Sequence, residues 1–556
     1  LRYLIVRSLR STLFIRLALG GMAMVLPASV LASDGPSVAA PAGTFVGEKI
    51  EAGDVFRGIP YAEAPTGDLR WRPPVRKADA AGEVDATAFG PVCHQPALPD
   101  VPANIYYETL PPQSEDCLSL NIWRPENAEK APVFVWIHGG SLLTGAGRLA
   151  LYDGARMAER GVIVVSINYR LGALGFMAHP ELSAESPDKV SGNYGLLDQI
   201  AALRWVERNI ASFGGDPDNV TVAGESAGGL SVMHLMASPL AAGLFDKAVM
   251  QSAYMVSEPA LDETSNGHPT AESEGLRLAE AAGAATLANL RAMDAADLTR
   301  SAAAAGYRTY PTVDGRVVPA QLVEVFDRGE QAQVPILAGF NSGEIRSLRM
   351  LLPPAPAGRE DYEGKIRAAY GDVADVFLRI YPSDAIEQSM LEATRDALYG
   401  WTSQRLAEKQ AADVPAFLYL FDHSYPAADK LGLPAFHGAE LPYMFGTIEE
   451  TARNWPRIPR NRAERSFSDA MIDYWASFAF SGQPVSDGNP TWPAYADGQS
   501  WMVFGDTPRV ARNVLNYRYD LVEHVVCRRR AAGDQQWNWN VGLGAPMLPA
   551  DAGDCR

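Results

Sequence analysis

The most informative stretch of this sequence is Thr221-Val222-Ala223-Gly224-Glu225-Ser226-Ala227-Gly228-Gly229. It contains the pattern Gly-x-Ser-x-Gly, with β-branched residues before it and small, mostly apolar residues after it. This order predicts a strand, a sharp turn that carries Ser226, and then a helix, which together make a nucleophile elbow. Such a turn exposes the Ser226 hydroxyl, and the N–H group of Ala227 can stabilise an oxyanion beside it. In a chain with 49 glycines the bare motif also fits an ordinary loop, so its meaning depends on its surroundings.

The segments on either side of this stretch alternate between strands and a helix. Residues 132–137 and 162–167 are apolar runs, as expected for strands that are buried on both faces of a sheet. Residues 244–250 look like another buried strand, and residues 192–209 have the apolar spacing of a helix. Together with the strand at 220–223, this alternation predicts an α/β fold with a mostly parallel sheet.

The second half of the chain adds further strands and larger helical segments. Residues 270–305 and 383–411 have helical patterns and are interpreted as insertions beside the main sheet. Short strands are predicted at 334–339 and 415–421. The helix predicted around residues 468–480 has one large aromatic and apolar face, which indicates a core helix.

The first 32 residues have the features of an export signal. Four arginines are their only charges, an apolar run follows from Leu17, and residues 30–32 offer a small-residue cleavage site before Ser33. A membrane anchor is the alternative, but Pro27 interrupts the run, which falls short of the ~20 apolar residues that span a bilayer. We therefore expect an exported protein, periplasmic or secreted, without a stable membrane anchor. Residues 33–556 are predicted to form a single domain.

The chain is acidic. Its formal net charge is −18, and removal of the four signal arginines would bring it to −22. Such a charge favours solubility and argues against nucleic acid or an anionic membrane surface as a partner. One short basic run, Arg528-Arg529-Arg530, is interpreted as solvated surface.

The four cysteines suggest disulfides, because their number is even and the chain is predicted to be exported. Four cysteines allow three pairings. The nearest-neighbour pairing, Cys93 with Cys117 and Cys527 with Cys555, would close one loop near each end of the chain, and four free thiols are the alternative. No spacing of Cys and His matches a metal site.

A serine nucleophile needs a base to remove its proton and an acid to orient that base. In folds with a nucleophile elbow the chain order is Ser, then Asp or Glu, then His. The histidines that follow Ser226 are His234, His268, His423, His437 and His524. The first is on the elbow helix, the second precedes any candidate acid, and the last lies beyond the last predicted helix. The remaining two, His423 and His437, both follow the strand at 415–421, and local pattern does not separate them.

Glu344 is the candidate acid, because it directly follows the strand at 334–338, and catalytic groups lie at the carboxyl ends of such strands. A glutamate in a loop is also commonly solvated. His138-Gly139-Gly140, after the strand at 132–137, is the type of glycine segment whose N–H groups stabilise developing negative charge. Its alternative interpretation is an ordinary glycine turn.

Taken together, these motifs resemble the type-B carboxylesterase/cholinesterase family of α/β-hydrolases, and in particular its para-nitrobenzyl-esterase-like bacterial members. The resemblance runs from about Val46 to about Asp520. The matching stretches are residues 56–65, 115–125, 136–145, 168–176, 192–215, 224–229, 339–344, 437–446 and 468–484. The resemblance implies an α/β-hydrolase fold: a central, mostly parallel sheet flanked by helices, with helical insertions that form a gorge.

The resemblance also implies a role for individual residues. Ser226 matches the nucleophile, Glu344 the acid and His437 the base, which selects His437 over His423. The imidazole of His437 should then lie within hydrogen-bond reach of Ser226. The family's oxyanion hole matches the N–H groups of Gly140, Ser141 and Ala227, and its early disulfide loop matches Cys93–Cys117.

Two positions depart from the family pattern. Ser141 stands where the family often has a third glycine, and its side chain would narrow the site. Glu344 is followed by Ile345 instead of the usual glycine, and Arg346 and Arg349 come soon after. These arginines could meet an anionic substrate group, but we interpret them as solvated or ion-paired.

The sequence therefore predicts a serine carboxylic ester hydrolase that acts on a small-molecule ester through a covalent acyl-enzyme, without a cofactor or metal. A related bond, in a carbamate, an amide or a polycarboxylate ester of a natural product, is the alternative within enzymes. A non-catalytic cholinesterase-like binding protein is the alternative from another class. Such proteins commonly lack the serine, whereas all three residues of the predicted triad are present here.

Overall fold

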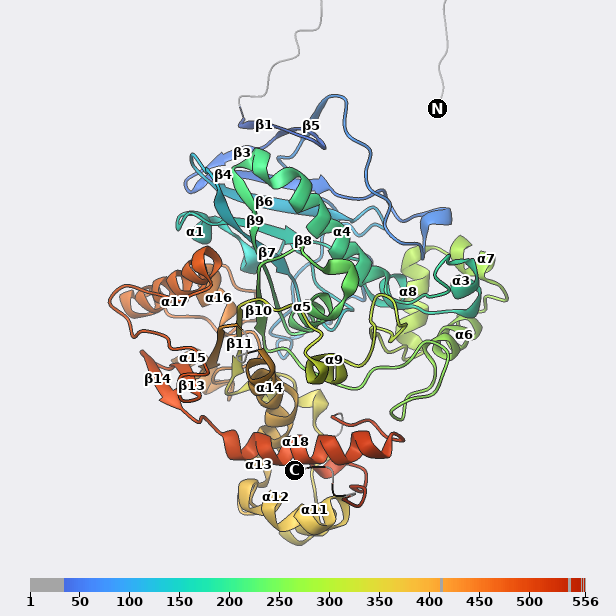
Figure 1. Cartoon of the computed structure of the whole chain (residues 1–556), viewed down its shortest axis with the longest axis vertical. Helices are drawn as coiled ribbons and strands as arrows, with labels where there is room; N and C mark the ends of the chain where they lie inside the picture. The colour runs from blue at the N-terminus through green and yellow to red at the C-terminus, as the bar shows by residue number, and fades with distance from the viewer. Residues whose placement is uncertain (1–34, 411–413, 539–541, 552, 554, 556) are drawn as a thin grey trace, which may run out of the picture. The chain divides into compact units, whose positions relative to one another are not determined.

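The computed structural model describes residues 35–410, 414–538, 542–551, 553 and 555. The predicted export signal, residues 1–32, lies outside the described residues. From Gly35 onward the chain forms one compact unit around a central sheet (Figure 1).

The central sheet has eleven strands among the described residues, in the order β14-β13-β12-β11-β10-β9-β7-β8-β6-β4-β3. Their bounds are β3 (Glu48–Ile50), β4 (Gly53–Pro60), β6 (Ser119–Pro125), β7 (Ala131–Ile137), β8 (Ile163–Ile167), β9 (Gly215–Glu225), β10 (Lys247–Gln251), β11 (Ile336–Asn341), β12 (Ala416–Phe421), β13 (Ser500–Phe504) and β14 (Pro508–Arg512). All pairs from β13 to β8 are parallel, and the pairs at both ends are antiparallel. This confirms the predicted α/β fold. A separate small sheet joins β1 (Ser37–Ala40), β2 (Gly43–Val46) and β5 (Glu83–Asp85).

Helices cover both faces of the central sheet (Figure 1). The helices of the first half are α1 (Ala155–Ala158), α2 (Gly172–Phe176), α3 (Pro180–Glu185), α4 (Tyr194–Asn209), α5 (Ala227–Ala237), α6 (Ala271–Ala281), α7 (Leu287–Ala292), α8 (Ala295–Ala304) and α9 (Leu322–Arg328). Those of the second half are α10 (Glu344–Ser347), α11 (Arg359–Tyr370), α12 (Ala374–Ile380), α13 (Ile386–Arg395), α14 (Trp401–Gln410), α15 (Pro426–Lys430), α16 (Leu441–Phe445), α17 (Arg462–Ser481) and α18 (Asn516–Ala532).

Strand β7 shows how the two faces are buried. Val133, Val135 and Ile137 belong to the core that includes α4 and α5, whereas Phe134 and Trp136 belong to the core that includes α16 and α17. Successive side chains of a strand point to opposite faces, so a strand that is covered on both sides must be apolar throughout. This is the physical reason for the apolar runs in the sequence.

The two predicted helical blocks are present, and they differ in position. Helices α6, α7 and α8 lie beside the sheet in Figure 1 and share a small core with residues of α2, α3 and α4. In the other block, α13 and α14 are joined by a π-helical turn at Asp396–Gly400, and α14 packs directly on β11 and β12. The second block is therefore not only an insertion beside the sheet, because part of it belongs to the main hydrophobic core.

Helix α18 has no counterpart in the sequence prediction, and it corrects the interpretation of the basic run. Arg528 is 3% exposed and Arg529 is 0% exposed, so two of the three arginines are buried instead of solvated. Arg528 Nη1 lies 3.0 Å from both carboxylate oxygens of Asp372. Arg530, on the outer side, binds Asp327 at 2.9 Å. The partners come from distant segments, which is why the charge run alone suggested a free surface.

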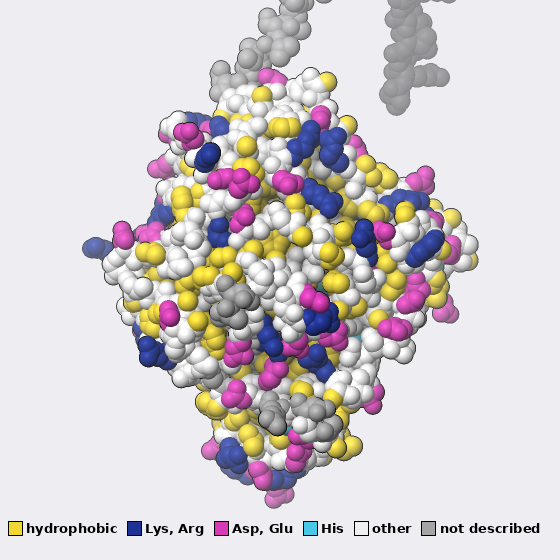
Figure 2. Space-filling model, viewed as in Figure 1, with side chains coloured by type: hydrophobic (Ala, Val, Ile, Leu, Met, Phe, Trp, Pro, Cys, Tyr) yellow, Lys and Arg dark blue, Asp and Glu magenta, His cyan; other side chains and the backbone are white. Residues whose placement is uncertain are grey.

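Both predicted disulfides are present. Cys93 is bonded to Cys117 and Cys527 to Cys555, with Cα–Cα distances of 5.1 and 5.7 Å. On the face of the molecule in Figure 2, basic side chains are interspersed with acidic ones. Among the residues that the structure describes, no helix combines the length and the apolarity that crossing a bilayer requires.

Candidate active site

Ser226 lies on the predicted sharp turn. Strand β9 ends at Glu225, helix α5 begins at Ala227, and Ser226 between them has φ 56° and ψ −121°. Its N–H group donates to the carbonyl oxygen of Gln251 at 2.9 Å, which ties the turn to the neighbouring strand β10. A Cβ atom at Gly224 would collide with the backbone of Gly228, so this close crossing of strand and helix requires glycine.

The glycine segment after β7 comes close to this turn. A Cβ atom at Gly139 would lie 2.9 Å from Glu225 Oε2 and 3.2 Å from Ser226 Cβ. Gly140 has φ 101° and Ser141 has φ 59°, and the Ser141 side chain is exposed. The N–H groups of Gly140, Ser141 and Ala227 have no hydrogen-bond acceptor within the described part of the chain. They can therefore donate hydrogen bonds to a substrate oxygen atom that lies between the glycine segment and Ser226.

Glu344 and His437 are in direct contact. Glu344 is the first residue of α10, and one of its carboxylate oxygens contacts Nδ1 of His437. The other, Oε1, accepts hydrogen bonds from the Ser252 hydroxyl at 2.6 Å and from the Asn341 N–H group at 2.8 Å. Glu344 is 0% exposed, so it is a fixed, buried acceptor and not a solvated loop residue.

The second ring nitrogen of His437 faces Glu225. Nε2 lies 3.0 Å from Glu225 Oε1, and no hydrogen bond joins the His437 ring to the Ser226 hydroxyl, although both side chains are described. Burial alone would lower the pKa of His437, but the charges of Glu225 and Glu344 outweigh it and raise the pKa to about 9. In this arrangement the imidazole lies between two buried carboxyl groups, and their negative charge, when they are ionised, favours its protonated form.

Sequence reasoning missed Glu225, which occupies a variable position of the Gly-x-Ser-x-Gly pattern. Burial raises the pKa of Glu225 to about 8 and that of Glu440 to about 7. Gln251 Nε2 donates to Glu440 Oε1 at 3.0 Å, and Trp475 Nε1 donates to Gln251 Oε1 at 3.0 Å. A buried network of carboxylates and amides therefore lies behind the elbow. The only signal in the sequence was an acidic residue beside a predicted nucleophile.

The other candidate residues lie elsewhere. His423 Nε2 contacts Glu464 Oε2 at 3.0 Å, and His234 Nε2 contacts Glu258 Oε1 at 2.8 Å, so each has a separate buried partner. Arg346 and Arg349 are bound by Gln388 and Glu387, respectively, as expected for arginines that do not contact a substrate group. No group of His, Cys, Asp and Glu in the described residues has the arrangement of a metal site.

Comparisons with known proteins identify the family of this chain and several of its relatives. The sequence model of the carboxylesterase family matches residues 34–522. The chain is 36% identical to a fumonisin B1 esterase of Sphingopyxis macrogoltabida, covering 82% of this chain and 84% of that one. It is 34% identical to a para-nitrobenzyl esterase of Bacillus subtilis, covering 79% and 88%. Among solved structures, a carboxylesterase from Geobacillus stearothermophilus has a TM-score of 0.74 at 33% identity, covering 87% of this chain and 98% of that one.

Proposed function

Because this chain belongs to the carboxylesterase family and is an ester hydrolase, we propose that it works through a Ser226–His437–Glu344 triad and a covalent acyl-enzyme. The observation that carries the proposal is the contact between Glu344 and His437 beside the nucleophile elbow. A carboxylate at Nδ1 fixes the imidazole so that Nε2 can serve the serine.

In the first half of the proposed reaction, Ser226 Oγ attacks the ester carbonyl while His437 Nε2 accepts the hydroxyl proton. The N–H groups of Gly140, Ser141 and Ala227 receive the developing oxyanion. The tetrahedral intermediate then collapses, the bond to the alcohol oxygen breaks, and His437 returns the proton to the leaving alcohol. The product of this half is Ser226 esterified by the acyl group.

In the second half, water attacks the acyl-enzyme carbonyl as His437 removes a proton from it. The same N–H groups hold the second oxyanion. Collapse releases the carboxylic acid, and the proton on His437 returns to Ser226 Oγ. Glu344 stabilises the charged imidazole in both halves, so its permanent burial beside Nδ1 serves each proton transfer.

For this reaction His437 must first lose the proton that it holds between Glu344 and Glu225. A doubly protonated imidazole has no free lone pair with which to accept the serine proton. Release of the proton frees Nε2 to turn from the Glu225 carboxylate to the adjacent Ser226 hydroxyl. The proposal therefore predicts activity that increases as the pH rises toward the pKa of His437.

Small-molecule esters are the proposed substrates. One relative is named for its action on fumonisin B1 and another for a para-nitrobenzyl ester, which indicates that related sites accept chemically different esters. A polycarboxylate ester, a carbamate or an amide is the second candidate class. The deciding experiment measures hydrolysis of p-nitrophenyl acetate, butyrate and octanoate by the wild type and by Ser226→Ala. Turnover that persists in Ser226→Ala would refute the triad.

Export is a separate proposal, and two disulfides support it because such bonds persist in oxidising compartments. The intact mass of the protein from cells that make the full chain tests it directly. A mature chain that begins at Ser33 is expected, and a chain that retains residues 1–32 would refute cleavage.

A further inference from the structure

The loop that is closed by Cys93–Cys117 contacts both the helix that carries Glu344 and the backbone of His437. The hydroxyl of Tyr106, in this loop, donates to the carbonyl oxygen of His437 at 2.8 Å. The same phenol oxygen lies 2.7 Å from Ser347 Oγ. Ser347 is the last residue of the short helix α10, of which Glu344 is the first. One oxygen atom thus joins the two backbone segments that carry Glu344 and His437.

The Tyr106 side chain is held rigidly in this position. Its ring packs against Phe436 and Trp455, with centroid distances of 6.5 and 6.0 Å. Burial raises the pKa of Tyr106 well above its ordinary value, so the hydroxyl keeps its proton. Because a carbonyl oxygen can only accept, the phenol proton is given to His437, and the Ser347 hydroxyl can donate to the phenol oxygen.

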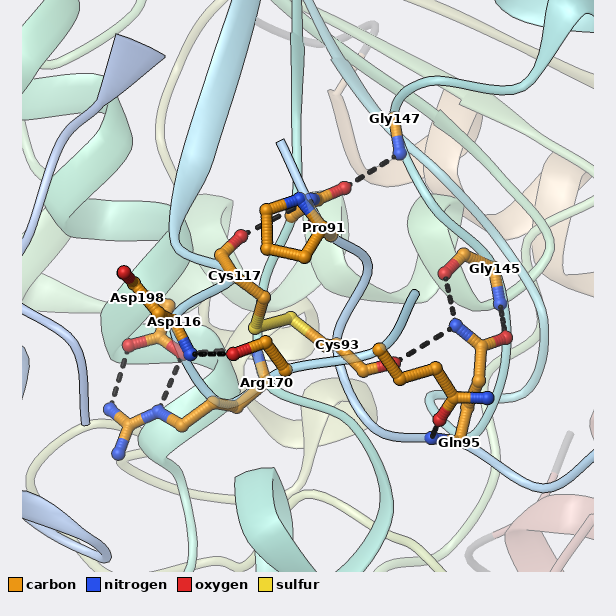
Figure 3. Close-up of a disulfide and its surroundings, with 12 residues drawn as sticks. Pro91, Cys93, Gln95, Asp116, Cys117, Gly145, Gly147, Arg170 and Asp198 are labelled. Carbon is orange, nitrogen blue, oxygen red and sulfur yellow. Dashed lines mark hydrogen bonds and ion pairs between the residues drawn. A yellow bond between two sulfur atoms is a disulfide. The ribbon is translucent and has the colours of Figure 1, made fainter. Parts of the chain in front are cut away.

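The base of the same loop binds Gly145, in the stretch that follows Gly140 and Ser141 after β7. Gln95 Nε2 donates to the carbonyl oxygen of Gly145 at 2.9 Å, and the Gly145 N–H group donates to Gln95 Oε1 at 2.8 Å. Figure 3 shows this pair next to the Cys93–Cys117 disulfide. The disulfide therefore closes a loop that contacts both the backbone of His437 and Gly145, four residues after Ser141.

The tip of the loop is anchored independently. Asp100 forms an ion pair with Arg453, and Asn454 Nδ2 donates to the carbonyl oxygens of Val101 and Asn104 at 3.1 and 3.2 Å. With both its base and its tip attached, the loop provides a fixed support from which the Tyr106 hydroxyl can act.

We propose that Tyr106 is a positioning residue of the hydrolytic reaction, whose hydroxyl holds the His437 backbone so that the imidazole stays aligned with Glu344 and Ser226. This inference rests on the proposed function. Tyr106 contacts no reacting atom and acts through His437. Loss of its hydroxyl would let the histidine segment move, which slows the proton transfers of both half-reactions and leaves ester binding unchanged.

The test compares Tyr106→Phe with Tyr107→Phe. The first variant keeps the ring and removes only the hydroxyl. The second is a matched control, because the Tyr107 ring lies over Arg453 at 5.5 Å and its hydroxyl makes no hydrogen bond in the described part of the chain. For p-nitrophenyl butyrate we expect kcat of Tyr106→Phe to fall roughly 10-fold and its KM to stay within about two-fold of wild type. Both kcat and KM of Tyr107→Phe should stay within about two-fold of wild type. Titration of reactive Ser226 with a phosphonate normalises each rate to the folded enzyme.

A second measurement does not depend on turnover. The proton between His437 Nδ1 and Glu344 should give a far-downfield NMR signal, which is sensitive to the alignment of the pair. We expect this signal in the wild type and in Tyr107→Phe, and a shifted or broadened signal in Tyr106→Phe. An unchanged kcat together with an unchanged signal in Tyr106→Phe overturns the inference, even if its melting temperature falls. Absence of ester turnover in the wild type would refute the proposed function, and the signal would still decide the role of Tyr106.

Discussion

Replacing Glu225 with glutamine tests whether this carboxylate keeps His437 protonated. Glu225 Oε1 lies 3.0 Å from His437 Nε2, both side chains are buried, and the pKa of His437 is raised to about 9. A neighbouring opposite charge raises the pKa of a base by about 1–3 units. Glu225→Gln keeps the shape of the side chain and removes its charge, so the pKa of His437 should fall by about two units, toward 7. A base with a lower pKa loses its proton at a lower pH, and the acid limb of activity should move in the same direction.

The assay is kcat/KM for p-nitrophenyl butyrate as a function of pH, because its acid limb reports the base of the free enzyme. The raised pKa keeps most of wild-type His437 protonated at neutral pH, whereas a larger fraction of His437 should be neutral in the variant. The plateau of the variant should be lower, because the charge that stabilises the imidazolium in the transition state is reduced.

The control is Glu440→Gln, which removes a second buried carboxylate whose influence on the pKa of His437 is smaller. Its acid limb should move less than that of Glu225→Gln. Glu225 and His437 titrate as a pair, so each limb gives a value for the pair. A Glu225→Gln limb within about 0.3 pH units of wild type would refute the electrostatic argument, because it would mean that Glu225 is neutral when the base ionises.

Three further substitutions have defined outcomes. Glu344→Gln should reduce kcat about 10³- to 10⁴-fold, because the amide no longer stabilises the charged imidazole, and its melting temperature should be nearly unchanged. A loss of kcat below about ten-fold would argue against the role of Glu344 as the acid. Gly228→Ala places a Cβ atom against the backbone of β7. We therefore expect lost activity and a loss of about 1–3 kcal/mol in the free energy of unfolding by urea. An unfolding midpoint equal to that of the wild type would contradict the steric argument. Replacing both Cys527 and Cys555 with serine opens a loop with a sequence separation of 28, which should cost about 3.5 kcal/mol of stability. No described residue of this loop forms a hydrogen bond or an ion pair with Ser226, Glu344 or His437. A large loss of kcat at 25 °C would therefore contradict its purely structural role.

Features with local causes could be predicted from the sequence. The elbow is an example, because a Cβ atom at Gly224 would collide with the backbone of Gly228, four residues later. The buried strands are another, because a strand covered on both faces has to be apolar along its whole length. In both cases the physical constraint acts on residues that are close in the sequence, so the pattern records it.

Features that depend on distant partners were missed or misread. The basic run of α18 looked like solvated surface, but Arg528 is buried against Asp372, a partner 156 positions away. Glu225 looked like a spacer within the serine motif, but its carboxylate contacts His437 on a segment that follows β12. A charge pattern records only that ionisable groups are present. Burial and pKa depend on the groups that other segments bring to them.

The candidate acid and the two candidate bases could be narrowed down because sheet order follows chain order at the site, and the family resemblance then selected His437 over His423. Ser226 follows β9, Glu344 follows β11 and His437 comes after β12, and β9-β10-β11-β12 are parallel neighbours. Glu225, Gln251, Gly339 and Tyr419 are at the same level across these four strands, so each chain segment emerges at the same edge of the sheet. Topology therefore brings candidates that follow such strands to the same edge of the sheet, but it does not choose among them, because His423, directly after β12, contacts Glu464 instead. Tyr106 belongs to a loop that precedes β7, outside this regular succession, and only the three-dimensional structure reveals its contact with the histidine.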